Sequence, residues 1–328
     1  MKTIIAALLM AAILMLPLIL PSAFYVGIAT QILIYGLFAV SVNVIAGYGG
    51  MVSLGHAAFL GIAAYAFALL TTVSGLSPLP AIIGSLALTT ATAALFGLIA
   101  LRTTGLGFLM ITLALGQIVW GVAFRFVDLT NGDNGISLPR SSASAAVVSP
   151  TVFFYVCLAT LAATMGFLAL LMRSPFGASI EGVRDQPRRM STLGYDVWVI
   201  RYVTYVVSGF VAGVAGILYI HLFRFISPHA LSLTVSSEAV LMVIAGGIGT
   251  AFGPLIGAAL VVLLKNVASA YTDRWPTLLG IIFLFIIVAV PEGLVPGLRR
   301  LGTKASTILR PKAVVSSRVV RADQKGTR

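Results

Sequence analysis

Few residues of this sequence could do chemistry, and they are not spaced for catalysis. The sequence contains no GxxxxGK[ST] phosphate-binding loop, no HExxH zinc motif and no GxSxG nucleophile motif. Its one cysteine, Cys157, excludes an internal disulfide and any multi-cysteine metal site. We therefore expect that the chain is not an enzyme and that it holds no metal or cofactor of its own.

Uncharged polar side chains inside long apolar stretches are better candidates for a function. Asn43, Ser53, Thr112 and Gln117 are such residues, and each could form an interhelical hydrogen bond or line a path for a neutral or zwitterionic solute. His56 lies in the same apolar surroundings. It is either a packed histidine bonded to a backbone carbonyl or a side chain that contacts a ligand.

Ionisable side chains inside the apolar stretches are rare, although an ion-coupled carrier needs them to hold its cation or proton. Glu238 is the one candidate acid. A carboxylate at the start of a helix is also favoured by the helix dipole, so it could simply be interfacial. We expect Lys265 to be buried or near the outer interface, and His221 and His229 to be solvated beside an external loop.

Two glycine clusters break the helical pattern, at residues 46–61 and 245–257. Such clusters at membrane depth indicate either close helix packing or a discontinuous helix that lines a cavity. We expect that these breaks allow the neighbouring spans to shift around a pathway. The glycines concerned are Gly47, Gly50, Gly246, Gly247 and Gly249.

The segment 173–201 is charge-dense and lies between two apolar blocks. Pro175 and Gly194 flank a pattern that predicts a short helix over 178–193, because helices often begin after proline and end at glycine. The segment is either a docking surface or a solvated loop that only satisfies the positive-inside rule. The residues that we expect to act in docking are Gly177, Glu181, Arg184, Arg188, Arg189 and Gly194.

Composition defines the elements that must position these residues. Of the 328 residues, 59% are hydrophobic and 9% are charged, whereas a soluble domain carries about 25% charged residues. No Asp, Glu, Lys or Arg occurs from Thr3 to Leu101. The chain is therefore an all-α, polytopic integral membrane protein. About ten spans are predicted, at 4–20, 26–46, 55–73, 79–101, 106–124, 151–172, 202–221, 236–246, 254–271 and 277–295.

Charge predicts the orientation. The net charge is +12, and most of the lysines and arginines fall in the segment 173–201 and after residue 298. Cytoplasmic flanks are enriched in these residues, so both termini are expected in the cytoplasm. We divide the chain into a transmembrane domain, 1–298, and a basic cytoplasmic tail, 299–328, which is expected to be disordered or on lipid headgroups. The first span resembles a signal peptide, but we favour its retention.

Several motifs, taken in order, resemble the permeases of branched-chain amino-acid ABC transporters of the high-affinity Liv type. Residues 47–65 read GYGGMVSLGHAAFLGIAAY and residues 105–136 read GLGFLMITLALGQIVWGVAFRFVDLTNGDNGI. The central segment has an SPFG start and an LGYD end, and residues 246–260 read GGIGTAFGPLIGAAL. The resemblance covers roughly residues 26–295. The order of the motifs and the TNGDNGI stretch favour the second, M-type permease of the pair.

This resemblance implies an importer subunit in the bacterial inner membrane. Such a permease pairs with a second, related permease, two cytoplasmic ATPase subunits bind the ATP, and a periplasmic binding protein delivers leucine, isoleucine or valine. The ATPase-facing loop of such importers follows an E-A-A-x-x-x-G pattern, of which only the glycine matches here, as Gly194. Alternatives are an ABC permease for urea, short amides or other amino acids, and an ion-coupled secondary carrier. Nucleic acid is not an expected partner.

Overall fold

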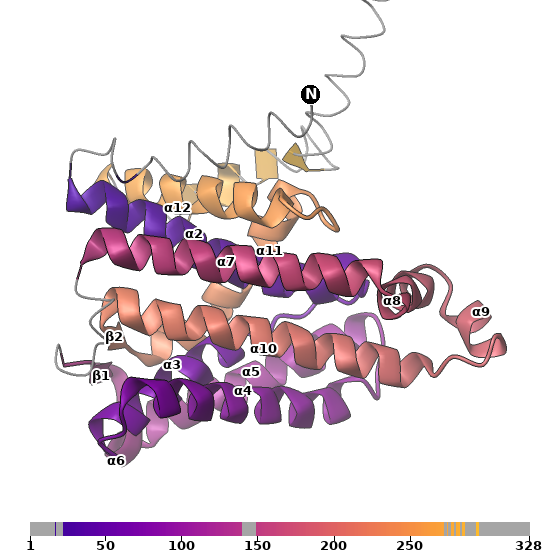
Figure 1. Cartoon of the computed structure of the whole chain (residues 1–328), viewed down its shortest axis with the longest axis horizontal. Helices are drawn as coiled ribbons and strands as arrows, with labels where there is room; N and C mark the ends of the chain where they lie inside the picture. The colour runs from indigo at the N-terminus through magenta and orange to yellow at the C-terminus, as the bar shows by residue number, and fades with distance from the viewer. Residues whose placement is uncertain are drawn as a thin grey trace, which may run out of the picture.

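The computed structural model describes residues 22–139 and 149–271, together with isolated positions at 17 and between 274 and 294. These residues form a bundle of long helices (Figure 1). Six helices of the described chain are long and apolar enough to cross a membrane. They are Ala23–Tyr48, Pro78–Ala100, Leu106–Arg125, Pro150–Arg173, Val197–Phe223 and Gly253–Tyr271. Two shorter apolar helices, His56–Thr72 and Leu233–Gly246, accompany them.

The helices follow one another with short connections. In the first half of the chain they are α2 (Ala23–Asn43), the π-helical turn η1 (Val44–Tyr48), α3 (His56–Thr72), α4 (Pro78–Ala100), α5 (Leu106–Arg125), α6 (Val127–Thr130) and the 3-10 turn η2 (Gly132–Asn134). In the second half they are α7 (Pro150–Arg173), α8 (Pro175–Asp185), α9 (Pro187–Thr192), α10 (Val197–Phe223), the 3-10 turn η5 (Pro228–Leu231), α11 (Leu233–Gly246) and α12 (Gly253–Tyr271). Two-residue strands, β1 (Ile136–Ser137) and β2 (Phe225–Ile226), pair antiparallel.

Eight of the ten predicted spans fall on described helices. The predicted first span, 4–20, and most of the tenth, 277–295, lie outside the described residues, as does the predicted tail 299–328. The eighth span is short, as predicted, because α11 ends at Gly246 and the chain then turns back into α12. The described part of the chain is thus mostly helical, as the composition predicts.

The middle of the bundle is formed by α2, α3 and α10, and α4, α11 and α12 pack around them. Tyr205 of α10 is fully buried, and its ring makes edge contacts with His56, Phe59 and Phe108. Small residues allow the helices to approach, since a side chain at Gly209 would meet the Cβ of Ala93 on α4. Exposed large apolar residues are frequent on α4 and α5, as expected for surfaces that face lipid or a partner.

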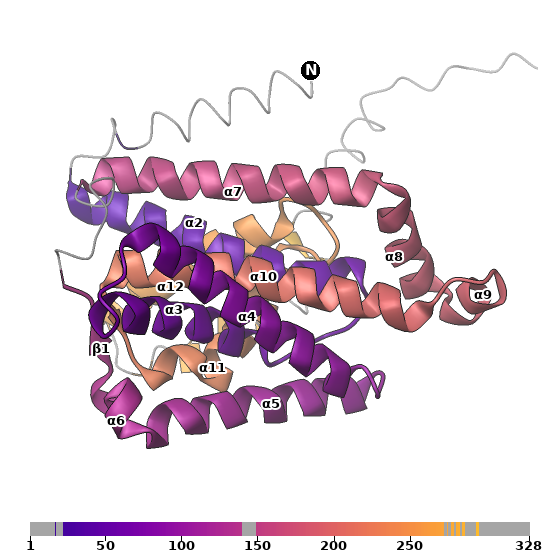
Figure 2. The ribbon, with the colours of Figure 1, turned by 60° about the horizontal axis from the view of Figure 1, so that its bottom comes forward.

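The two ends of the bundle differ. Figure 2 shows α8 and α9 projecting at one end, while α6 and β1 lie at the other. At the α6 end, the TNGDNGI stretch of residues 130–136 forms a tight turn. Asn131, Gly132 and Gly135 all have positive φ, at 62°, 58° and 65°. The hydroxyl of Thr130 closes this turn by donating to the carbonyls of Ala123 and Phe126.

Candidate functional site

The first glycine cluster is a true helix break. After Asn43 the helix widens into the π-helical turn η1, and regular helix resumes only at His56. Gly50 has a φ of +68°, a conformation that side chains rarely adopt. The amide of Met51 donates to the Ile45 carbonyl at 2.9 Å and closes the turn. The predicted interruption near Gly47 and Gly50 is therefore present.

The second glycine cluster turns the chain back on itself. Gly247 and Gly249 have φ values of 116° and 75°, and the Thr250 hydroxyl donates to the Gly247 carbonyl at 2.7 Å. A side chain at Gly246 would meet the backbone of Gly253. Close packing and an unwound segment, which the sequence left as alternatives, therefore occur together in this hairpin of α11 and α12.

Asn43 joins the two breaks. Its Nδ2 donates to the Thr250 carbonyl at 3.1 Å, and its Oδ1 accepts from the Gly249 amide at 2.9 Å. The side chain is buried. A Cβ atom on Gly47 would lie 2.6 Å from the Gly249 nitrogen, so only glycine permits this approach. Segments about 200 residues apart in the sequence are thus held together by one amide.

Arg184 of α8 connects the central segment to the first break. One of its terminal nitrogens, Nη1, donates to the Gly47 carbonyl at 3.1 Å. The side-chain stem fills the space over Gly50, where a Cβ would lie 2.6 Å from Cγ of Arg184. Its Nε donates to Asp185 at 2.8 Å, and this hydrogen bond lowers the pKa of the Asp185 carboxyl from its ordinary value. The guanidinium group of Arg184 therefore binds a backbone carbonyl within the first helix break.

The prediction of one helix over 178–193 is wrong, because the segment forms two helices, α8 and α9, which meet at Gln186. Pro187 has no amide hydrogen and disfavours helical geometry in the residue before it. Gln186 accordingly has a φ of −145° and a ψ of 75°. At the far end, Gly194 has a φ of +88° and the Tyr195 amide donates to the Met190 carbonyl at 3.1 Å. This is a Schellman ending, as predicted for a glycine at this position.

The two short helices face different surroundings. α8 buries Ile180 and Val183 with Ile200 of α10, and Gly177 lets α8 turn sharply against the end of α7 because a side chain there would meet the backbone of Met172. By contrast, α9 has no buried residue. It forms an outer face with the chain that follows it, which we name the α9 face. Its exposed residues are Arg188, Arg189, Leu193, Tyr195 and Trp198.

Glu181, the remaining predicted docking residue, is exposed on α8. The structure thus separates the predicted docking residues. Arg188, Arg189 and Gly194 belong to the α9 face, Glu181 is exposed on α8, and Gly177 and Arg184 lie where the segment meets the bundle.

His56 is a packed histidine with serine partners. Its Nδ1 lies 3.0 Å from the Ser53 hydroxyl and its Nε2 lies 2.6 Å from the Ser208 hydroxyl. Ser208 donates its own proton to the Ser41 carbonyl, so Nε2 of His56 donates to Ser208 and Nδ1 accepts from Ser53. All four residues are buried. Ser53 and His56 therefore fix the start of α3, and the expected backbone-carbonyl partner is replaced by hydroxyls.

Thr112 and Gln117 of α5 have different surroundings. Thr112 is buried, and its hydroxyl accepts from the Leu54 amide at 3.3 Å, which joins α5 to the first break. Gln117 lies one and a half turns further along and lines a pocket at the α6 end of the bundle. The sequence grouped the two residues as path candidates, but the structure does not bring them together.

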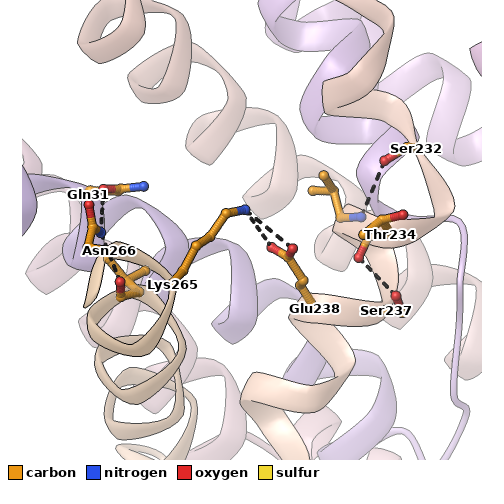
Figure 3. A network of polar contacts seen from close by, with 9 residues as sticks. Gln31, Ser232, Thr234, Ser237, Glu238, Lys265 and Asn266 are labelled. Atoms are coloured by element: carbon orange, nitrogen blue, oxygen red, sulfur yellow. Dashed lines mark hydrogen bonds and ion pairs between the residues drawn. The ribbon is translucent and has the colours of Figure 1, made fainter. Parts of the chain in front are cut away.

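A contact between Glu238 and Lys265 is not predicted from the sequence. In the structure Lys265 Nζ lies 3.3 Å from both carboxylate oxygens of Glu238 (Figure 3). Glu238 is buried and lies beyond the first turn of α11, and 26% of the Lys265 side chain is exposed. The pair joins α11 to α12 across their hairpin. The only signal in the sequence is that an acid and a base occur inside two neighbouring apolar segments.

The predicted solvent exposure of His221 is wrong. The residue was expected to be solvated, but it is buried between Phe67 and Phe153, and its Nδ1 lies 2.7 Å from the Ile217 carbonyl of its own helix. Because α10 extends to Phe223, His221 lies within the helix and not in the following loop. His229, in η5, is exposed as predicted.

These features define a class of protein: a multi-pass helical membrane protein with two interrupted hairpins and a polar surface segment attached to one of them. The family of the branched-chain amino acid transport system permease component matches residues 24–291. The chain belongs to this family, which confirms the resemblance drawn from the motifs.

Individual relatives agree with the family. The high-affinity branched-chain amino acid transport system permease protein LivM of Salmonella typhimurium is 27% identical over 301 residues, which cover 83% of this chain and 70% of that protein. LivM of Escherichia coli K12 is 28% identical over 299 residues with the same coverage. LivH of Escherichia coli K12 is 24% identical over 181 residues, 52% of this chain and 58% of that protein. The M-type assignment is therefore confirmed. No solved structure matches the chain significantly.

Proposed function

We propose that this chain is the M-type permease subunit of an ABC importer in the bacterial inner membrane, and that it forms half of the pathway for leucine, isoleucine or valine. A second, related permease forms the other half. Two ATPase subunits bind the ATP on the cytoplasmic side, and a periplasmic binding protein delivers the substrate. Residues 1–298 form the membrane domain, with about ten spans and both termini inside, and 299–328 form the basic tail.

One observation carries the mechanism: a continuous set of contacts runs from the α9 face to both helix breaks. The α9 face offers two cations and several exposed apolar side chains, the composition that is common in protein interfaces. Behind it, α8 is anchored in the bundle and holds the Gly47 carbonyl through Arg184. Asn43 then joins this break to Gly249 and Thr250.

We infer that ATPase closure pushes α8 and α9 as a rigid unit. The push reaches the first break directly and the second break through Asn43. Interrupted helices at membrane depth are where permeases change shape, because their free backbone groups can exchange partners without unfolding a complete span. The chain itself performs no covalent chemistry in this mechanism.

Charge supports the orientation. Arg173, Arg184, Arg188 and Arg189 lie in or beside the two short helices at one end of the bundle, which would be the cytoplasmic end. The end with α6 and the strands would then face the periplasm and the binding protein.

The experiment is uptake of radiolabelled leucine by cells that express this chain with its partner permease, ATPases and binding protein. ATP-driven import predicts that uptake persists when a protonophore collapses the proton gradient and stops when ATP is depleted. The buried Glu238–Lys265 pair is the feature that favours the alternative, an ion-coupled carrier. Uptake that follows the proton gradient, or that needs no ATPase subunit, would establish that alternative.

A further inference from the structure

A pocket of about 360 Å³ lies at the end of the bundle opposite α8 and α9. It is bounded by the second half of α5, the turn η2, the turn η5 and the start of α11. Its volume is within the range of small-molecule sites. The pocket is open to the surroundings, and Gln117, which the sequence analysis selected as a path residue, lines its wall.

One wall of the pocket is aromatic. Trp120 and Phe124 of α5 are stacked, with ring centroids 5.4 Å apart and planes inclined by 10°, and both rings line the pocket. A pair of flat apolar rings at an open surface is suited to a short aliphatic side chain. A fully polar ligand such as urea has no apolar group to pack against these two rings, so it would lose the contacts on that side of the pocket.

The opposite side of the pocket is polar. It carries an acidic group and hydrogen-bond donors, which bind the ammonium and the carboxylate of a zwitterion respectively. Asp133 of η2 supplies a carboxylate for an ammonium group. Gln117 and Ser232 supply amide and hydroxyl donors for a carboxylate. Figure 3 shows Ser232 and Thr234 at the start of α11, where the first amides of the helix have no acceptor within the helix.

We propose that this pocket is a low-affinity receiving site for one zwitterionic aliphatic amino acid on the periplasmic side of the permease. Asp133 holds the ammonium group, the donors of α5 and α11 hold the carboxylate, and Trp120 with Phe124 covers the side chain. The site rests on the proposed function, because it names where the permease itself first contacts the substrate. It gives the permease a selectivity of its own, separate from that of the binding protein.

The test is protection of an introduced cysteine. Thr234→Cys places a thiol at the exposed rim of the pocket, and the native Cys157 is buried and does not compete. The importer is studied in right-side-out membrane vesicles, from which the soluble binding protein has been washed. A membrane-impermeant maleimide labels the thiol with or without leucine. Ser74→Cys, exposed in the turn between α3 and α4, is the matched control.

Leucine should slow labelling of Thr234→Cys about ten-fold at a concentration about nine times its Kd, since the fraction of unoccupied sites is 1/(1 + [L]/Kd). 4-Methylpentanoate, which is leucine without the ammonium, and isoamylamine, which is leucine without the carboxylate, should protect much less. Asp133→Asn should remove the protection and leave the labelling rate without leucine unchanged. Ser74→Cys should not respond to any of the three compounds.

Labelling that leucine does not slow, or that 4-methylpentanoate slows equally, would overturn the receiving site. A thiol at position 234 that does not react at all would do the same, because the pocket would then not open to the periplasm. Leucine uptake by the complete importer, measured in parallel, tests the proposed function separately. Uptake without protection removes the pocket alone, whereas protection without ATP-dependent uptake removes the importer role and keeps the pocket.

Discussion

Asn43→Ala should weaken the contact between the two helix breaks. The change removes two hydrogen bonds, at 3.1 Å to the Thr250 carbonyl and 2.9 Å from the Gly249 amide. Hydrogen bonds between membrane helices contribute about 0.6 kcal/mol on average and about 1.7 kcal/mol at most. The two groups left without partners are partly buried, which adds to the loss. We therefore expect the free energy of unfolding to fall by about 1–3 kcal/mol.

The assay has two readouts, because stability and transport must be separated. Unfolding of the purified permease in mixed micelles measures the free energy, and leucine uptake per folded molecule measures transport. Thr90→Ala is the matched control, since within the described residues its hydroxyl bonds to the Leu86 carbonyl of its own helix and to no other helix. That variant should change stability by less than about 0.5 kcal/mol. Asn43→Ala with wild-type stability and wild-type uptake would refute the idea that Asn43 links the breaks.

Three further predictions follow from the same structure. Reporter fusions at Gln186 and Asn134 should report opposite sides of the membrane, and the same side for both would contradict the orientation. Gly249→Leu places a side chain at a φ of +75°, so uptake should fall by more than the amount of folded protein in the membrane; equal losses would indicate a packing role only. Lys265→Met should destabilise the permease by about 3–5 kcal/mol, because it leaves Glu238 buried and unpaired. Adding Glu238→Gln should restore most of that stability in unfolding measurements, and failure to restore it would show that the pair is not the relevant contact.

The sequence predicts the helices well because a membrane span needs a long apolar run, and composition alone reveals such runs. It also predicts both interruptions, since the glycines are dense enough to show. Composition does not reveal which segments meet. Asn43 and Gly249 are joined by one amide over 206 positions, and nothing local in the sequence indicates that contact.

Local chemistry explains the errors in the polar regions. The expected single helix over 178–193 ignored Pro187, whose restriction of the preceding residue splits α8 from α9. His221 was expected in water because the end of α10 was placed two residues too early. Glu238 and Lys265 lie 27 residues apart, and only the turn at Gly247 brings them together.

Copurification of the ATPase with the Arg188→Glu/Arg189→Glu permease tests whether the ATPase docks on the α9 face. Reversing two exposed cations of the α9 face should weaken docking by at least about 2 kcal/mol, or roughly 30-fold in affinity. Arg125→Glu, an exposed arginine at the end of α5, is the control and should bind normally. Reporter fusions verify that the reversed charges leave the topology unchanged.

The doubly reversed permease should insert and pair with its partner permease, but it should lose the ATPase and most substrate-stimulated ATP hydrolysis. Full ATPase association and full uptake by that variant would contradict this prediction. The segment between α7 and α10 would then only satisfy the positive-inside rule. The contacts from α8 through Arg184 to Gly47 and Asn43 would not carry any movement of the ATPase to the helix breaks.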